Sequence, residues 1–197
     1  MEIRIQALEE LLGAARTTYY GRARDQKSIS LLEQVFDALE TPAPQSQLES
    51  GRLPVCRYLS DISLSLDSDD SDLRQLMQAF MAIEPALQWR RRQGDCTGAS
   101  EGFSENHANA MLVGPEGLEL REDVWLGVSL VGPNVRYPDH RHLPEETYLV
   151  MSPGDFRQGR NEWVHVAGGE TFYNPKNIVH AMRSSDRPLL VFWALKE

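Results

Sequence analysis

The stretch from Tyr137 to Phe156, YPDHRHLPEETYLVMSPGDF, gathers side chains that bind cations and move protons. Two imidazoles, His140 and His142, precede the carboxylate of Glu146 and the phenol of Tyr148. These four residues occupy even-numbered positions, and side chains two apart in an extended segment point to the same face. Imidazole and carboxylate groups suit divalent metal ions, and burying them without one would be costly. The spacing therefore predicts a metal site.

A further ligand must come from another part of the chain. The segment GETFYNPKNIVH, Gly169 to His180, offers His180 at the start of a predicted strand, after a turn at Asn174–Pro175. Nothing in the sequence pairs His107 or His165 with these segments, so we expect both to be structural.

The two segments together resemble the two motifs of the cupin superfamily. The first motif has the form H-x-H, three or four residues, Glu, six residues and Gly. Here seven residues separate Glu146 from Gly154, one more than usual. The second has the form Gly, five residues, Pro-x-Gly, two residues and His. Asn177 replaces its second glycine, and Asn also tolerates the left-handed turn conformation. The resemblance implies an all-β cupin fold, a jelly-roll β-barrel around a metal ion.

A narrower pattern is similar to the cupin-type dimethylsulfoniopropionate (DMSP) lyases, most closely the DddQ kind. Tyr137 precedes His142 by five residues, Tyr148 follows Glu146 by two, and His180 lies thirty-eight beyond His142. This resemblance implies that His142, Glu146, Tyr148 and His180 hold one divalent ion, whereas the general cupin pattern would use His140 in place of Tyr148. Zinc, iron or manganese would fit such a ligand set.

The implied reaction is a β-elimination that converts DMSP into dimethyl sulfide and acrylate. A cation bound to the substrate carboxylate would stabilise the charge that develops when the neighbouring carbon loses its proton. Tyr148 is the first candidate for the base, and Tyr137 is the second, with His140 accepting or relaying its proton. A sulfonium suits an aromatic face, and the candidates for that face, beside Tyr137 and His140 as substrate-binding residues, are Trp163, Tyr173 and Trp193.

Two other functions fit a cupin with this site. One is an iron dioxygenase, which usually keeps both histidines of H-x-H as ligands and does not need Tyr148. The other is a non-catalytic cupin that binds a small carboxylate, for which the flanking Tyr137 and Tyr148 would not be required.

The elements that position these residues fall into two regions. Apolar residues recur at helical spacing in residues 5–15, 29–39 and 73–81, which predicts an N-terminal α-helical extension over residues 1–95. Ser68 or Ser71 is expected to cap the third helix, and Pro85 to end it. Residues 96–197 contain short strand-like runs separated by turns, including LELRE at 118–122, and are predicted to form the barrel. The helices could cover the barrel mouth or mediate dimerisation.

Composition narrows the choice of partners. The chain has 197 residues, a net charge of −9 and two cysteines, Cys56 and Cys96, in unrelated surroundings. An acidic chain is a poor partner for nucleic acid or an anionic membrane. The N-terminus lacks an apolar signal segment, and no run reaches the length of a membrane span. We therefore expect a cytoplasmic monomer or homodimer that acts on a small molecule.

Overall fold

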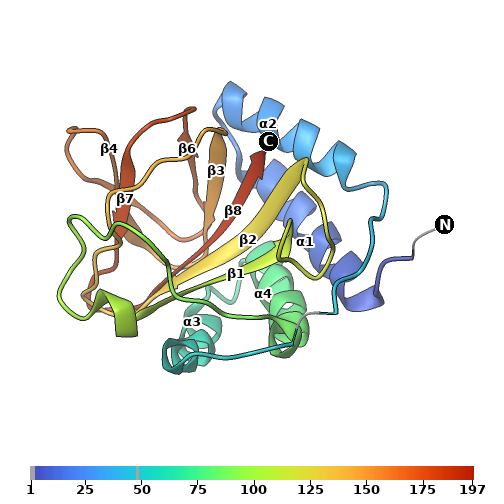
Figure 1. Cartoon of the computed structure of the whole chain (residues 1–197), viewed down its shortest axis with the longest axis horizontal. Helices are drawn as coiled ribbons and strands as arrows, with labels where there is room; N and C mark the ends of the chain where they lie inside the picture. Colours follow the sequence, from blue (N-terminus) through green and yellow to red (C-terminus); the bar gives the residue numbers. More distant parts are fainter. Residues whose placement is uncertain (1–2, 48) are drawn as a thin grey trace.

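The computed structural model describes residues 3–47 and 49–197. Helices occupy the first half of the chain and strands the second half (Figure 1). The helical elements are α1 (Gln6–Arg22), α2 (Gln26–Ala38), η1 (Pro54–Tyr58), α3 (Leu59–Ser65), α4 (Ser71–Ile83), η2 (Glu84–Ala86) and η3 (Phe103–Glu105).

The helix boundaries follow from local side chains. The Asp25 carboxylate accepts hydrogen bonds from the first backbone N–H groups of α2, those of Lys27 and Ser28. Asp70 caps α4 by accepting from the N–H of Leu73, so neither of the expected serines has this role. The α-helical geometry of α4 ends at Ile83, shortly before Pro85, whose ring cannot continue a helix.

The strands form two antiparallel sheets. The five-stranded sheet has the order β1-β2-β8-β3-β6, and the three-stranded sheet has the order β5-β4-β7. Their bounds are β1 (His107–Val113), β2 (Val124–Val131), β3 (Glu146–Val150), β4 (Gly154–Gln158), β5 (Val164–Val166), β6 (Thr171–Asn174), β7 (His180–Arg183) and β8 (Leu189–Lys196). Residues 118–122 form no strand, because only isolated bridges at Glu119 connect them to other segments.

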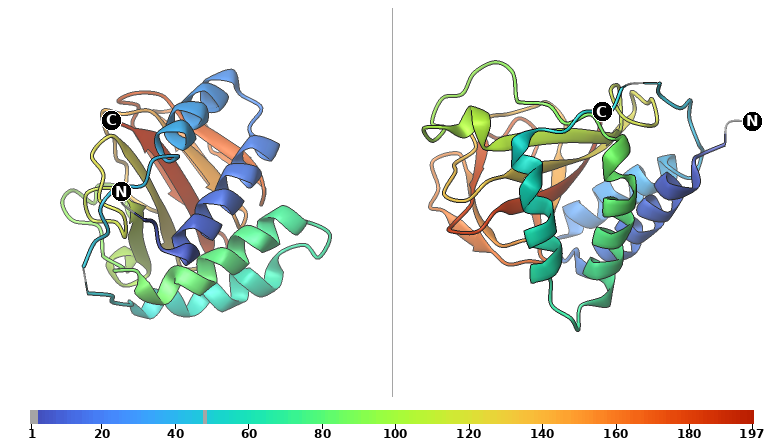
Figure 2. Two further views of the ribbon diagram at one scale, coloured as in Figure 1. Left: turned by 90° about the vertical axis from the view of Figure 1, so that its right-hand side faces the viewer. Right: turned by 90° about the horizontal axis from the view of Figure 1, so that it is seen from below.

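The helices cover the outer face of the five-stranded sheet (Figure 2). Phe80 of α4 packs edge-on against Phe192 of β8, with ring centroids 5.3 Å apart, and the Tyr19 hydroxyl of α1 donates to the Thr147 carbonyl of β3. A single apolar core contains buried residues from α1, α2, α4, β1, β2 and β8. The helices therefore back the sheet, and a second apolar cluster lies between the two sheets.

A buried ion pair attaches the segment before α1 to the connection between β1 and β2. The Arg4 guanidinium donates to both carboxylate oxygens of Glu119, at 2.6 and 3.0 Å, and also to the Leu39 carbonyl. The Glu119 side chain is fully buried and that of Arg4 is 4% exposed. Because desolvated charges need their partners, each group depends on the other for its burial.

Replacing Arg4 with methionine should destabilise the protein by about 3–5 kcal/mol, because the Glu119 carboxylate would stay buried without its main partner. Urea unfolding would measure this change. Arg16→Met is the matched control, since the Arg16–Glu40 pair is exposed and contributes about 0–1 kcal/mol. Equal losses in the two variants would contradict the prediction.

The described residues contain no helix long and apolar enough to cross a membrane. Cys56 is buried, Cys96 is exposed, and both are free thiols.

Candidate metal centre

Strand β3 presents Glu146 and Tyr148 on the inner face of the five-stranded sheet. Glu146 pairs with Asn174 of β6 and Leu195 of β8, and Tyr148 pairs with Trp193 of β8. The Glu146 side chain is 5% exposed, and Asn174 donates to its Oε2 at 3.1 Å. The predicted alternation along this strand therefore holds from Glu146 onward.

His142 and His180 reach Glu146 from two separate segments. His142 lies in the loop before β3, and His180 begins β7 in the other sheet. Each Nε2 lies 3.3 Å from Glu146 Oε2. A two-way backbone bridge between His140 and His180, at 3.0 and 2.9 Å, holds the two segments together.

Carbonyl groups fix the orientation of both imidazoles. His142 Nδ1 lies 2.8 Å from the Pro144 carbonyl, and His180 Nδ1 lies 3.0 Å from the Ile178 carbonyl. Because a carbonyl oxygen can only accept, each Nδ1 carries a hydrogen, and a ring in its neutral form directs the Nε2 lone pair inward. This is the arrangement that metal-binding histidines usually show.

The three inward groups form a set that fits a divalent cation. One ligand atom each from His142, Glu146 and His180 lies within 4.8 Å of the others. Three such atoms lie this close favourably when a proton or a metal cation is shared between them. Imidazole and carboxylate donors suit zinc, iron or manganese, so the residues present can hold such an ion.

The pKa values of Glu146 and His142 reflect the short distances between the three groups. Burial alone would raise the pKa of the Glu146 carboxyl, but hydrogen bonds and charge from His142 and His180 lower that pKa well below its usual range. Burial opposes the imidazolium of His142, but Glu146 outweighs it and raises the His142 pKa. A buried carboxylate that stays ionised attracts cations to this position.

Tyr148 stands beside the three groups. Its hydroxyl lies 3.2 Å from His180 Nε2. Burial raises the pKa of Tyr148 well above its usual value, and the charge of Glu146 raises it further. Without a cation next to it, Tyr148 is therefore a protonated phenol.

His140 and Tyr137 form a second layer. His140 does not belong to the group of ligand atoms, and its ring packs on that of His180 with centroids 4.1 Å apart. Burial and the neighbouring His180 lower the pKa of His140 to about 3, so this imidazole is neutral. The Tyr137 ring lies 5.1 Å from that of His140, and Asn109 donates to the Tyr137 hydroxyl at 2.8 Å.

A cavity of about 180 Å³ adjoins this site. Most of its wall comes from the inner face of the five-stranded sheet. It is lined by Asn109, Met111, Trp125, Ser129, Tyr137, His140, His142, Glu146, Tyr148, Met182, Trp193 and Leu195. Five of the site residues expected from the 137–148 segment therefore face one space, together with Trp193.

Two predicted substrate-binding residues lie elsewhere. The Trp163 ring stacks with three guanidinium groups, those of Arg136, Arg157 and Arg183, at 4.5 to 5.5 Å. Tyr173 pairs with Thr147, which faces the outer side of the sheet, and its hydroxyl donates to a neighbouring carboxylate. Neither residue lines the cavity. In β6 the side chains paired with the inner face are those of Phe172 and Asn174.

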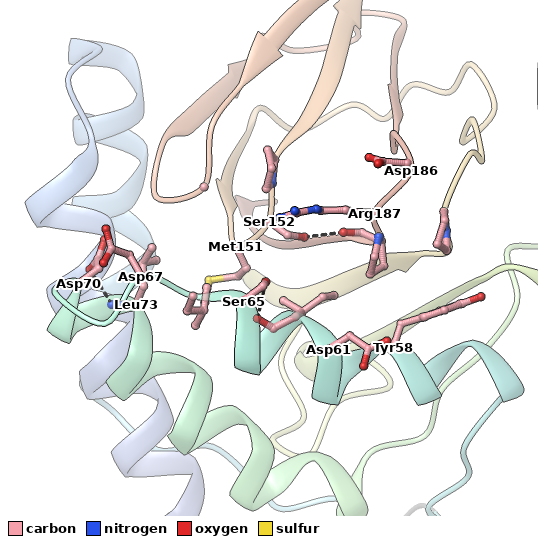
Figure 3. A pocket seen from close by; sticks show the side chains of 16 residues that line it. Tyr58, Asp61, Ser65, Asp67, Asp70, Leu73, Met151, Ser152, Asp186 and Arg187 are labelled. Carbon is pink, nitrogen blue, oxygen red and sulfur yellow. Dashed lines mark hydrogen bonds between the residues drawn. The ribbon is translucent and has the colours of Figure 1, made fainter.

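A larger hollow of about 510 Å³ between α3, α4 and the barrel loops lacks such a set of groups (Figure 3). Several of its polar side chains already have partners. Asp70 caps α4 and pairs with Arg22, and Ser152 donates to the Pro188 carbonyl. The smaller cavity beside His142 is therefore the candidate active site.

Two antiparallel sheets define a cupin barrel, and the His–Glu–His group between them could bind a metal ion. A family model for dimethylsulfoniopropionate lyases matches residues 27–191. The chain belongs to this DMSP lyase family.

Individual relatives agree with this assignment. The DMSP lyase DddQ of Ruegeria pomeroyi is 29% identical over 122 residues, which span 60% of each chain. A crystal structure from work on the DMSP lyases RdDddP and RnDddQII is 26% identical and has a TM-score of 0.72, covering 97% of this chain and 92% of that chain. The crystal structure of DddQ from Ruegeria pomeroyi is 20% identical and shares the fold, with a TM-score of 0.68 over 98% of this chain and 93% of that chain.

Replacing His142 with alanine should remove bound metal, because one of three converging ligands is lost. Asn174→Leu keeps all three ligands but frees Glu146 Oε2, and should weaken metal binding about 10- to 100-fold. Elemental analysis of the purified protein and competition with a chelator would measure both effects. His165→Ala is the control, because that exposed ring pairs with Asp155 on the three-stranded sheet. Full metal retention in His142→Ala would contradict the assignment.

Gly127 makes room for Trp193 in the cavity wall. A Cβ at residue 127 would lie 2.2 Å from the Trp193 ring and 2.6 Å from the Ala110 carbonyl oxygen. Gly127→Ala should therefore destabilise the protein by about 1–3 kcal/mol. Gly13→Ala in α1 is the control, because nothing lies near its added methyl group and alanine favours helix. Urea unfolding would compare the two, and a neutral Gly127→Ala would show that the Trp193 ring is free to move aside.

Proposed function

We propose that this chain is a metal-dependent lyase that cleaves DMSP into dimethyl sulfide and acrylate. The proposal rests on one observation above all. In a member of the DMSP lyase family, His142, Glu146 and His180 converge beside a small cavity that also contains two buried tyrosines. The curated relative, whose matched segment spans 60% of its length, carries that activity in its name.

The reaction needs a base and a way to hold the substrate carboxylate. A divalent ion held by His142, Glu146 and His180, with Tyr148 as a further ligand, would withdraw charge from that carboxylate and favour loss of the neighbouring proton. The base takes this proton, the carbon–sulfur bond breaks, and dimethyl sulfide leaves with the bonding electrons. Acrylate remains, and the base later returns its proton to water.

We assign the base to a tyrosine, with Tyr148 as the first choice. Its hydroxyl is buried 3.2 Å from His180 Nε2, so a cation held by His180 would lie beside it and favour the phenolate. Tyr137 is the second choice, because Asn109 donates to its oxygen and would stabilise a phenolate there. Neutral His140 packs against the Tyr137 ring, a position suited to relaying a proton.

The cavity wall provides the groups that would contact the sulfonium end of DMSP. Trp193 lies in the register row of Tyr148, so its indole is within reach of a small molecule bound at the metal. Aromatic faces attract weakly hydrated cations. Met111, Met182 and Leu195 add apolar surface that excludes water from a carbanion-like transition state.

Protein loaded with zinc, iron or manganese should release dimethyl sulfide and acrylate from DMSP in equal amounts. Headspace gas chromatography and liquid chromatography would measure the two products. Tyr148→Phe should lower kcat at least 100-fold if Tyr148 is the base, since general base catalysis contributes about 10²–10⁴-fold. Oxygen uptake should remain zero, and oxygen consumption with iron would instead favour a dioxygenase.

Tyr20→Phe is a suitable control, because that tyrosine lies on α1 on the other side of the sheet and packs against Phe36. If metal-loaded wild-type protein yields neither product, the proposed activity is wrong. If Tyr148→Phe keeps full turnover while Tyr137→Phe does not, the base is Tyr137.

A further inference from the structure

The cavity wall on the inner face of the five-stranded sheet includes two residues, Trp125 and Asn109, to which the reaction described above assigns no contact with the substrate. The residues of this wall form rows, because paired residues on neighbouring strands lie side by side. One row runs from Glu146 through Leu195 of β8 to Trp125 of β2, and strand spacing places Trp125 Cα about 10 Å from Glu146 Cα. Another row runs from Ser129 of β2 to Asn109 of β1. Trp125 and Asn109 thus lie on the same inner face as the ligands, at different ends of the wall.

Both residues carry a buried polar atom without a partner. The indole Nε1 of Trp125 and the amide Oδ1 of Asn109 have no hydrogen-bond partner among residues 3–47 and 49–197. The other end of the Asn109 amide is fixed, because its Nδ2 donates to Tyr137. The Asn109 backbone is fixed as well, through a two-way bridge to Arg90 at 2.8 Å in each direction. Such unpaired buried atoms are rare in folded proteins, and both of these belong to residues that line one small cavity.

The two atoms require opposite partners. An indole N–H can only donate, so Trp125 needs an acceptor. An amide oxygen can only accept, so Asn109 Oδ1 needs a donor or a positively charged group. Met111 and Leu195, which also line the wall, provide neither. A ligand that satisfies both atoms carries an acceptor at one end and a donor or a positive charge at the other, and a small zwitterion meets both requirements.

We propose that Trp125 and Asn109 are substrate-binding residues that recognise the two ends of a small zwitterion. The Trp125 N–H donates to a substrate carboxylate oxygen, in the row that contains Glu146. The Asn109 oxygen faces the methyl groups around the sulfonium, whose hydrogens carry part of the positive charge. The cavity of about 180 Å³ has the volume of about six water molecules, which suits a compact ligand of this kind. This inference rests on the proposed function for the identity of the zwitterion.

Binding of half-ligands to metal-loaded protein separates the two roles. Isothermal titration calorimetry would use propionate as the anionic probe and trimethylsulfonium as the cationic probe. Trp125→Phe, which removes the N–H together with part of the indole ring, should weaken propionate binding about 10-fold and leave trimethylsulfonium binding unchanged. Asn109→Leu should weaken trimethylsulfonium binding, and Asn109→Asp, which adds a negative charge, should strengthen it. Unchanged propionate binding in Trp125→Phe, or equal cation binding in both Asn109 variants, would overturn the inference.

Turnover provides a second readout. Trp125→Phe should raise KM for DMSP with little change in kcat, whereas Asn109→Leu should change both because it also frees the Tyr137 hydroxyl. If wild-type protein releases no dimethyl sulfide but Trp125→Phe still loses propionate binding, the proposed function fails and the role of Trp125 stands. If wild-type protein turns over DMSP and Trp125→Phe matches its KM, the role of Trp125 fails and the function stands.

Stability distinguishes recognition from a structural role. The Trp89 indole N–H donates to Glu84 at 2.8 Å, so Trp89→Phe should lower the urea midpoint of the ligand-free protein. Trp125→Phe removes the same ring atoms but breaks no such bond, so it should lower that midpoint less than Trp89→Phe does. An equal or larger loss of stability in Trp125→Phe would mean that its N–H has a structural partner, which contradicts the inference. Trp89→Phe should also leave the binding of both probes unchanged, because Trp89 packs against Phe80 in the helical part.

Discussion

The site depends on lone pairs that the backbone forces toward one another. Carbonyl groups of Pro144 and Ile178 hold the Nδ1 atoms of His142 and His180, so both Nε2 atoms face the Glu146 carboxylate. This arrangement is repulsive when all three groups are deprotonated and becomes favourable when a proton or a metal cation is shared. The fold must therefore hold the three groups in place before the ion binds, and the shared core behind the sheet provides that rigidity.

The two faces of the five-stranded sheet have separate tasks. Its outer residues pack against α1, α2 and α4, while its inner residues hold the metal ligands and the cavity wall. Alternation along each strand makes this division possible, because neighbours in sequence point to opposite sides. Thr147 contacts Tyr19 of α1, whereas Glu146 and Tyr148 on either side of it belong to the site. The helices therefore support the site from behind and do not form its roof.

The parts of the site that lie close together in the chain could be predicted from the sequence. The fold, the helix stripes and the grouping of His142, Glu146 and Tyr148 follow from spacing and motifs. Residues whose place depends on strand register could not be predicted in this way. Tyr173 and Phe172 are adjacent, and only the pairing of β6 with β3 shows that Phe172 shares the row of Tyr148. Asn109 and Trp125 precede the motifs by many residues and carry no local signal. Arg92 also carries no local signal, yet its guanidinium lies over the Tyr137 ring, 5.8 Å from the centroid.

The position of β8 has a consequence for biosynthesis. This strand lies at the centre of the sheet, yet it follows all the others in sequence, and it alone joins the β1–β2 pair to the β3–β6 pair (Figure 1). A ribosome delivers the chain in order, so both outer halves exist before the strand that unites them. Until β8 has been made, the apolar faces of the helices have no complete sheet to pack against. The nascent polypeptide therefore exposes apolar surface for most of its synthesis, when chaperones would have most to protect.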